Sequence, residues 1–180
     1  MHSPNNLLIL GAGQYGVMAA EIAEAMGAFD RIAFLDDSFA TRHPERSEGS
    51  SKVSLIGTIA DLPNFAAQFN FGFVAIGTPA LRRKLTEQLK QNNLALATLV
   101  HPTAYVSPSA QLEPGCSVEP NATVQTAAVI KQASFIASGA VIRHNATVGE
   151  FCHIDCNAVV DTLAVVPAGT HILAQEAYRA

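Results

Sequence analysis

Residues 134–154 read SFIASGAVIRHNATVGEFCHI, and an aliphatic side chain returns at every sixth position of this stretch. The step continues in both directions along the chain. Such a register is typical of a parallel β-helix, in which each six-residue unit forms one flat side of a triangular coil and three units close a turn. The aliphatic positions are Val106, Leu112, Val118, Val124, Ile130, Ile136, Ile142, Val148, Ile154, Val160, Val166 and Ile172.

The residue two places before each aliphatic position is always small. Because a triangular coil has a narrow interior, one branched aliphatic side chain fills each side, and the neighbouring inward position has room only for a small residue. An alternating β-sandwich is the competing interpretation, but its hairpins would break the phase. The small positions are Ala104, Ala110, Cys116, Ala122, Ala128, Ser134, Ala140, Ala146, Cys152, Ala158, Ala164 and Thr170.

Glycine and asparagine recur in one phase of the same repeat. Both residue types tolerate the left-handed backbone conformation that a sharp corner requires. We therefore expect the corners of the coil at Gly115, Asn121, Gly139, Asn145, Asn157 and Gly169.

Composition limits the classes of function. The chain has 180 residues, enough for one or two domains, and only 14% are charged, so we expect part of the surface to be covered by copies of the chain. The net charge of −4, without a basic run, argues against nucleic acid as a partner. No apolar stretch approaches the roughly 20 residues that span a bilayer. A membrane partner is therefore not expected, and the predicted location is cytoplasmic.

The three cysteines indicate no disulfide framework, because their number is odd. Cys116 and Cys152 occupy small inward positions of the repeat, and we expect both to fill the core. Cys156 lies outside that phase and has no constellation of ligands or nucleophiles around it in the sequence.

Residues 6–98 follow a different pattern, that of an α/β domain. We expect strands at 7–10, 31–35, 53–56 and 71–76 and helices at 17–26, 60–68 and 79–91, with 94–100 leading into the coil. Residues 38–52 are polar and aperiodic, which predicts a surface excursion. The order of elements predicts a small parallel sheet with helices on its faces. The domains are thus 1–98 and 99–180.

A glycine-rich turn follows the first strand of this domain. Gly11, Gly13 and Gly16 lie between a strand and a helix, and the acidic pair Asp36 and Asp37 ends the second strand. This context favours a phosphate or nucleotide site, with Gly77 lining the same crevice. The bland alternative is that the glycines only permit helix–strand packing. About 95 residues make one mononucleotide half, so a nucleoside diphosphate fits better than NAD, and an oxidoreductase is the weaker hypothesis.

The whole chain resembles the PglD/NeuD-type nucleotide-sugar acyltransferases, a family of hexapeptide-repeat transferases that includes sialic-acid O-acetyltransferases. The resemblance rests on LLILGAGQYG at 7–16, FLDD at 34–37, FVAIG at 73–77, VHPTAYVSPSA at 100–110 and VIRHNATVGEFCHI at 141–154. It implies an α/β Rossmann-like half-domain, which holds a nucleotide sugar, followed by an all-β left-handed parallel β-helix. It also implies a homotrimer with acetyl-CoA bound between adjacent β-helices.

The resemblance implies roles for individual residues. His144 matches the family's general base, and Asn145 stands where the family has Asp or Glu. His153 matches the histidine on the acetyl-CoA side, and Thr162 is assigned to the same coenzyme. Gly11, Gly13, Gly16, Asp36, Asp37 and Gly77 match the nucleotide-sugar side. A neutral imidazole can accept the proton of a sugar amine or hydroxyl as it attacks the thioester.

Spacing adds two expectations about the histidines. His144 and His153 are one and a half sides of the triangle apart, so they should project from different faces and share a site only across a subunit interface. His171 should lie directly one coil above His153. A zinc site built on that pair is a weak alternative, since its spacing does not match the γ-class carbonic anhydrases.

The chain departs from the family pattern in two respects. Asn145 can orient an imidazole but cannot stabilise imidazolium by charge, and Asp155, Asp161 and Glu150 are candidates to replace the acid. The chain also ends after about four coils, where we expect relatives to continue for about two more. The leading hypothesis is an acetyl-CoA-dependent N- or O-acetyltransferase acting on a nucleotide-linked sugar. The alternative is a shortened, non-catalytic relative that binds a sugar nucleotide as a trimer.

Overall fold

The computed structural model describes residues 5–40 and 53–179, which form two compact units that meet between Ala97 and Thr98. Most of the predicted excursion, residues 41–52, lies outside the described residues, and Asp37–Ala40 form a short 3-10 helix, η1. None of the helices in the described ranges is long and apolar enough to cross a bilayer.

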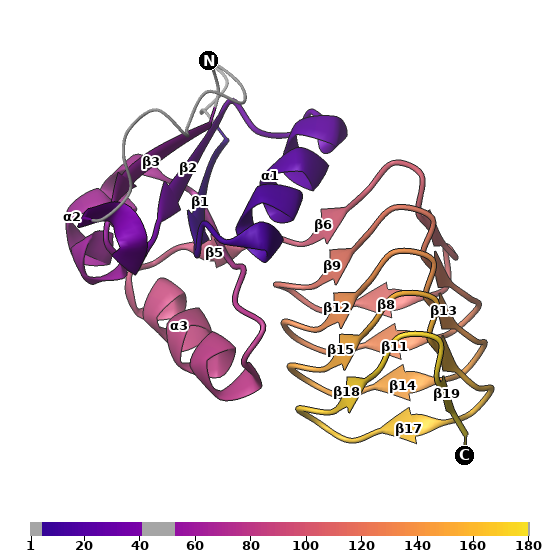
Figure 1. Ribbon diagram of the computed structural model, residues 1–180. Coiled ribbons are helices and arrows are strands. Elements are labelled where there is room, and N and C mark those ends of the chain that lie inside the picture. The colour runs from indigo at the N-terminus through magenta and orange to yellow at the C-terminus, as the bar shows by residue number, and fades with distance from the viewer. Residues whose placement is uncertain (1–4, 41–52, 180) are drawn as a thin grey trace. The chain divides into compact units, whose positions relative to one another are not determined.

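The first unit contains a five-stranded parallel sheet in the order β3-β2-β1-β4-β5 (Figure 1). This confirms the predicted small parallel sheet, although β4 ends two residues earlier than expected. Its strands are β1 (Asn6–Leu10), β2 (Arg31–Leu35), β3 (Val53–Gly57), β4 (Phe71–Val74) and β5 (Ala95–Leu96).

Helices cover both faces of this sheet. α1 (Gln14–Met26) begins three residues earlier than expected and ends at Gly27, whose φ of 62° is left-handed. α3 (Pro79–Gln91) matches its prediction and packs with α2 against Leu8 and Leu10. α1 packs on the other face of the sheet, where its Gly16 lies beside the Phe34 ring.

The helix expected over 60–68 was wrong as a single element. The segment forms three short pieces, η3 (Ile59–Asp61), α2 (Leu62–Phe65) and η4 (Ala66–Gln68). Pro63 has no N–H to donate to a carbonyl one turn earlier, so a continuous α-helix cannot run through it. The capping box of Thr58 and Asp61, which bonds the Asp61 carboxylate to the Thr58 N–H at 2.9 Å, closes the first piece separately.

The second unit is a parallel β-helix built from three stacked sheets (Figure 1). Each strand has two residues and pairs with the strand one coil later, as Thr123 pairs with Val141. The strands are β6 (Leu99–Val100), β7 (Tyr105–Val106), β8 (Gln111–Leu112), β9 (Ser117–Val118), β10 (Thr123–Val124), β11 (Val129–Ile130), β12 (Phe135–Ile136), β13 (Val141–Ile142), β14 (Thr147–Val148), β15 (His153–Ile154), β16 (Val159–Val160), β17 (Val165–Val166), β18 (His171–Ile172) and β19 (Ala177–Tyr178). The predicted register is confirmed and continues by one strand at each end.

The interior of the coil contains the two predicted columns. Ile142 and its equivalents from Val118 to Val160 are fully buried, and the small residues from Cys116 to Ala164 pack against them. Each buried valine or isoleucine contributes about 1.5–3 kcal/mol relative to exposure. The expectation for the cysteines is also confirmed, since Cys116 and Cys152 are buried. Their thiols donate to the carbonyls of Lys131 and Pro167 at 3.1 and 3.0 Å.

The corners repeat one backbone conformation every six residues. Those predicted at glycine and asparagine are confirmed, with φ between 57° and 85°. Five further corners take the same conformation at Ala127, Ala133, Phe151, Leu163 and Gln175, although it costs about 1–2 kcal/mol for such residues. A backbone hydrogen bond offsets this cost: the N–H of Phe151 donates to the Gln132 carbonyl of the previous coil at 2.9 Å.

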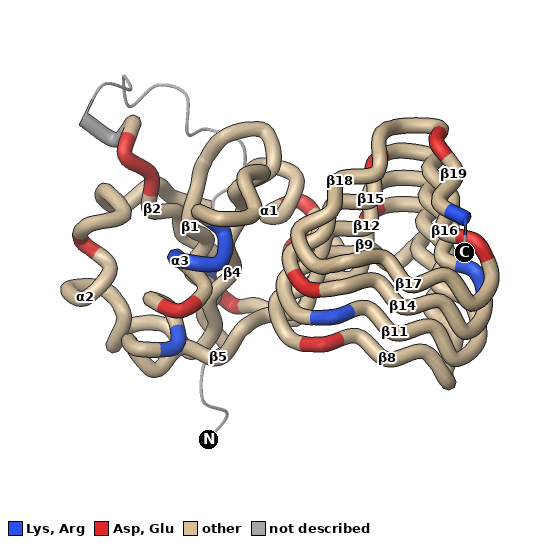
Figure 2. The backbone as a smooth tube through the Cα atoms, turned by 90° about the horizontal axis from the view of Figure 1, so that it is seen from below, with Lys and Arg blue, Asp and Glu red and all other residues tan. Residues whose placement is uncertain are grey.

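Charge is confined to these corners. Every Asp, Glu, Lys and Arg of residues 98–179 lies outside the strands (Figure 2). The flat faces of the coil therefore present no Asp, Glu, Lys or Arg side chain.

The inward column yields a direct test of the fold. Ile142→Asp places an unpaired charge at a fully buried position, which costs more than the coil can offset. We expect loss of the β-sheet circular dichroism signal and of cooperative melting. Ala174→Asp, which adds a charge at an exposed corner position and not on a strand, is the matched control and should melt as the wild type does. A folded Ile142→Asp protein with unchanged melting would contradict the register.

Candidate functional site

The glycine-rich turn of the first unit is set by packing at two of its three glycines. Gly11 has φ of 102°, and a Cβ there would lie 2.8 Å from Ile76 Cδ1 and 3.0 Å from the Ala75 carbonyl oxygen. A Cβ on Gly16 would overlap the Gly11 carbonyl. Both positions therefore need glycine for the fold alone, as the bland alternative proposed.

Gly13 differs from its two neighbours. Its φ is −73°, which any residue adopts, and no atom lies within 4 Å of where a Cβ would be. It is the N-cap of α1, its cap is not closed by a side chain, and the first turn of the helix carries no acidic residue. The open space thus lies at the positive end of a helix, where an anionic group is favoured.

Gly77 lies beside the same turn. A Cβ on Gly77 would be 3.3 Å from the Tyr15 ring, which belongs to the first turn of α1. The structure therefore brings Gly11, Gly13, Gly16 and Gly77 to the carboxyl edge of the sheet, as predicted for the crevice of an open parallel sheet.

The acidic pair is engaged by the protein's own backbone. Asp36 accepts hydrogen bonds from the N–H groups of Ala12 at 2.6 Å and Ser38 at 2.9 Å, and from the Ser38 hydroxyl. Asp37 accepts the N–H of Ile59 at 3.1 Å. Asp36 thus ties the end of β2 to the glycine-rich turn, and this observation favours a role in holding the turn.

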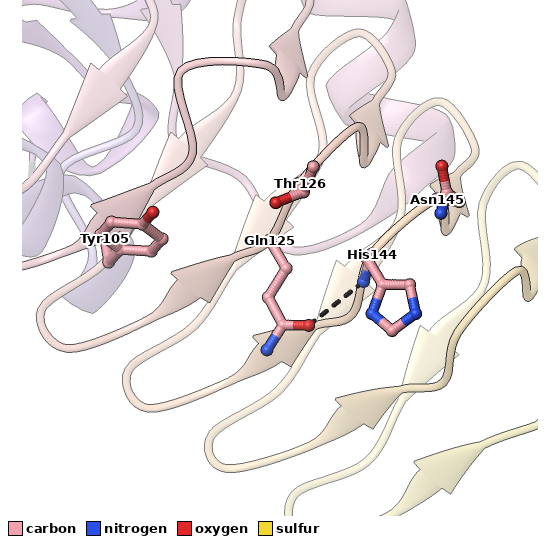
Figure 3. Close-up of a pocket in the computed structure, with 5 residues that line it drawn as sticks. All are labelled: Tyr105, Gln125, Thr126, His144 and Asn145. Carbon is pink, nitrogen blue, oxygen red and sulfur yellow. Dashed lines mark hydrogen bonds between the residues drawn. The ribbon is translucent and has the colours of Figure 1, made fainter.

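A second candidate site is a pocket of about 360 Å³ on one corner of the coil (Figure 3). It is lined by residues from three successive coils, namely Tyr105, Gln125, Thr126, His144 and Asn145. The predicted pair His144 and Asn145 therefore lies in a pocket. All five side chains offer hydrogen-bonding groups, and none carries a carboxylate or a basic amine.

The main chain of His144 is held on both sides. Its N–H donates to the Gln125 side-chain oxygen at 3.2 Å, and its carbonyl accepts the N–H of Leu163 at 3.4 Å. Asn145 follows at the left-handed corner, with φ of 60° and its N–H donating to the Thr126 carbonyl at 3.0 Å. The corner is therefore fixed by both neighbouring coils, while the imidazole extends from it (Figure 3).

His153 lies on a different side of the coil, as its spacing predicts. It belongs to β15, whereas the corner of His144 joins β13 to β14 in the other two sheets. Its ring stacks on that of His171, one coil later, with centroids 4.7 Å apart and planes 10° from parallel. Within the described residues no group of three His, Cys, Asp or Glu side chains is arranged to hold a metal.

Thr162 lies on the corner of His144, one coil further along the chain, and not beside His153. Its hydroxyl oxygen is buried without a hydrogen-bond partner. Thr162 and His153 therefore lie on different sides of the coil, and a ligand that contacts both would have to reach both sides.

Two of the acids considered as replacements for the missing carboxylate are bonded elsewhere. Asp155 accepts the N–H of Cys156 at 2.7 Å and lies 3.5 Å from His171 Nε2. Asp161 pairs with Arg143 at 2.6 Å and accepts the N–H of Thr162 at 2.8 Å. These hydrogen bonds lower the pKa of both carboxyls, with the backbone N–H as the largest cause in each case.

Sequence reasoning missed three residues of the pocket, Tyr105, Gln125 and Thr126. The repeat held the signal for two of them. Thr126 precedes His144 by eighteen residues, one full coil, and Gln125 by nineteen, so both must share its corner.

Comparison with known proteins finds matches to both units of the chain. A family model described as the PglD N-terminal domain matches residues 6–89. The acetyltransferase domain of PglB from Neisseria gonorrhoeae FA1090 is 30% identical, with a TM-score of 0.81 over 97% of this chain and 91% of that one.

Two further structures share the fold. The same PglB domain in complex with acetyl coenzyme A is 26% identical over 99% of this chain and all of that one, with a TM-score of 0.67. A mutant of perosamine N-acetyltransferase from Caulobacter crescentus, in complex with CoA and GDP-perosamine, is 21% identical over 98% and 90%, with a TM-score of 0.75. At most a tenth of these chains is unmatched, too little for two further coils, so the expectation that relatives continue was wrong for them.

The three glycines of the turn yield a paired test. In Gly13→Ala the new methyl group contacts no protein atom, so the variant should melt within a few degrees of the wild type. Because the methyl group blocks close approach to the helix N-terminus, it should weaken binding of a nucleoside diphosphate by about tenfold or more. Gly16→Ala should destabilise the whole first unit. Calorimetry and thermal melting measure both effects. Unweakened binding by Gly13→Ala would contradict a phosphate site at this turn.

Proposed function

The chain belongs to the PglD-type nucleotide-sugar acetyltransferases, and on that premise we propose that His144 is the general base with which it transfers acetyl from acetyl-CoA to a nucleotide-linked sugar. Family membership makes the reaction class that of an acetyl-CoA-dependent sugar acetyltransferase and the coil the left-handed type of parallel β-helix.

The observation that carries the proposal is the pocket around His144. A corner held by both neighbouring coils presents one imidazole among Tyr105, Gln125, Thr126 and Asn145. A neutral imidazole there can take the proton from an amine or hydroxyl of the sugar as that atom attacks the thioester carbonyl. The bond from nitrogen or oxygen to the acetyl carbon forms, the carbon–sulfur bond breaks, and the departing thiolate receives a proton.

The glycine-rich turn is the proposed site for the nucleotide. Gly13 leaves space at the N-terminus of α1 for a diphosphate, with Gly77 beside it, while Gly11 and Gly16 set the shape of the turn. Asp36 and Asp37 support this site by holding the backbone around it. The relatives solved with GDP-perosamine are the reason to test GDP-linked as well as UDP-linked sugars.

We assign His153 and Thr162 to the coenzyme by resemblance, and their separation on the coil favours a site completed by a second copy of the chain. The faces that would meet are uncharged. On the sheet of β7 the outward residues are Tyr105, Thr123, Val141, Val159 and Ala177, and on that of β8 they are Gln111, Val129, Thr147 and Val165. A homotrimer would bury such faces. None of the three cysteines is in a disulfide, which agrees with a cytoplasmic location.

Asn145 favours a second candidate function, that of a non-catalytic binder. Because no acid follows the proposed base, a binder that holds a sugar nucleotide without turnover has one specific observation in its favour. It would retain nucleotide binding at the glycine-rich turn while leaving acetyl-CoA unconsumed.

His144→Ala tests the base. General-base catalysis contributes about 10²–10⁴-fold, so kcat/KM should fall by at least about 100-fold, followed as release of the CoA thiol with a panel of UDP- and GDP-linked amino sugars. The melting temperature should change little, because the imidazole lies outside the inward column. His101→Ala, which removes an imidazole from a different corner of the coil, where it bonds Thr103, is the matched control. Turnover of His144→Ala at the wild-type rate would remove His144 from this role.

Sedimentation equilibrium tests the assembly. We expect a species of three times the 19.0 kDa chain, because the uncharged faces of the coil exclude water when they pack against copies. Val159→Lys places a charge on one such face and should shift the mass towards a single chain without loss of folding. A wild-type protein that sediments as one chain at micromolar concentration would argue against the trimer.

A further inference from the structure

Tyr105 provides the broad apolar surface of the pocket that His144 lines. It points outward from β7 and is 58% exposed. The outward residues of the next two coils on the same sheet, Thr123 and Val141, are smaller, so they leave space beside the ring. In the ranges that the structure describes, no hydrogen bond or ring contact engages the Tyr105 side chain. Much of this ring is therefore available to a ligand.

Gln125 lies between Tyr105 and His144 (Figure 3), as the strand order β7-β10-β13 requires. Its side-chain oxygen accepts the His144 N–H at 3.2 Å. Because a backbone N–H can bond only to the oxygen of an amide, this contact also fixes where the –NH₂ group of Gln125 lies. That group is a donor of two hydrogen bonds, and it is turned away from the His144 nitrogen. The pocket thus combines an apolar ring with an oriented donor.

This combination is the complement of a sugar ring, which has C–H groups on its faces and hydroxyl groups at its rim. The C–H groups carry partial positive charge, which favours contact with the negative face of an aromatic ring. The polar groups of Thr126 and Asn145 add uncharged partners for the rim. No Lys or Arg lines the pocket, and Arg143, which precedes His144, pairs with Asp161 at 2.6 Å. The carboxylate of a sugar acid would therefore be desolvated without a basic partner, and the pocket favours a neutral sugar.

We propose that a neutral acceptor sugar packs its C–H face on Tyr105 while one of its oxygens accepts a hydrogen bond from the Gln125 amide, so that Tyr105 determines specificity for the sugar. The inference rests on the proposed function, because it places the acceptor sugar beside His144. The contact with the ring involves no reacting atom, so it is the same before and during acetyl transfer. Such uniform binding lowers KM and leaves kcat nearly unchanged.

Calorimetry separates the sugar's contribution to binding from that of the nucleotide. We expect Tyr105→Ala to weaken binding of the UDP- or GDP-linked amino sugar that the wild type binds best by about tenfold, because an aromatic contact is lost. Binding of UDP or GDP alone should not change. Tyr105→Phe retains the ring and should bind the sugar within about twofold of the wild type.

Val159→Ala is the matched control, since it trims an apolar side chain from the same sheet outside the pocket and should leave sugar binding unchanged. Unweakened sugar binding by Tyr105→Ala, or equal weakening of the nucleotide alone, would overturn the proposal. A Tyr105→Ala protein that sediments at lower mass than the wild type would assign the ring to a contact between copies of the chain and would overturn it equally.

Two further measurements distinguish this proposal from the role of His144. In Tyr105→Ala the loss should appear in KM, whereas His144→Ala should lower kcat and still bind the sugar as the wild type does. A fall in kcat with unchanged KM in Tyr105→Ala would contradict a role in binding. UDP-glucose and UDP-glucuronate differ only in the carboxylate, and the neutral sugar should bind more tightly. The reverse order would overturn the assignment to a neutral sugar, whether or not His144 is the base.

Discussion

The narrow interior of the triangular coil is the constraint on which the rest of the second unit depends. Each side admits one branched aliphatic residue and one small residue, so residues of the types of Ile142 and Ala140 recur every six positions along the chain. Polar atoms in the small column need partners inside the wall. The Ser134 hydroxyl has two, donating to the Gly149 carbonyl at 2.7 Å and accepting the Cys152 N–H at 2.9 Å. Every inward position is therefore taken by a side chain that packs the core, and none is left for a functional side chain.

Function is therefore left to the corners. A corner has no inward side chain to accommodate, and its backbone is held by bonds to the coils on either side, as Asn145 is held by the Thr126 carbonyl. A side chain such as His144 can extend outward from a rigid base without disturbing the core. A general base needs such rigidity, because it must lie within hydrogen-bond reach of the proton that it removes before its pKa can matter. The previous coil supports this corner through Gln125, whose side-chain oxygen accepts the His144 N–H at 3.2 Å.

The period in the sequence accounts for most of the fold, because it reflects sterics that act locally. It predicts the inward position of Ile142 and the left-handed corner at Asn145 from residue type and spacing alone. Other features depend on the direction of a side chain, which spacing does not contain. The Asp36 carboxylate turns back to the Ala12 and Ser38 N–H groups, a contact that no motif announces. Pro63, by contrast, was a visible signal against one helix over 60–68, and its missing N–H explains the break between η3 and α2.

The central claim is that this coil carries an acetyl-CoA-dependent transferase. Calorimetric titration of acetyl-CoA into the purified protein, with CoA and UDP or GDP titrated in parallel, tests that claim most directly. The account predicts saturable binding of acetyl-CoA at one site per chain, independent of nucleotide binding at the glycine-rich turn. Binding of a nucleotide with no detectable binding of acetyl-CoA, in protein shown to be folded, would contradict it and favour the non-catalytic binder.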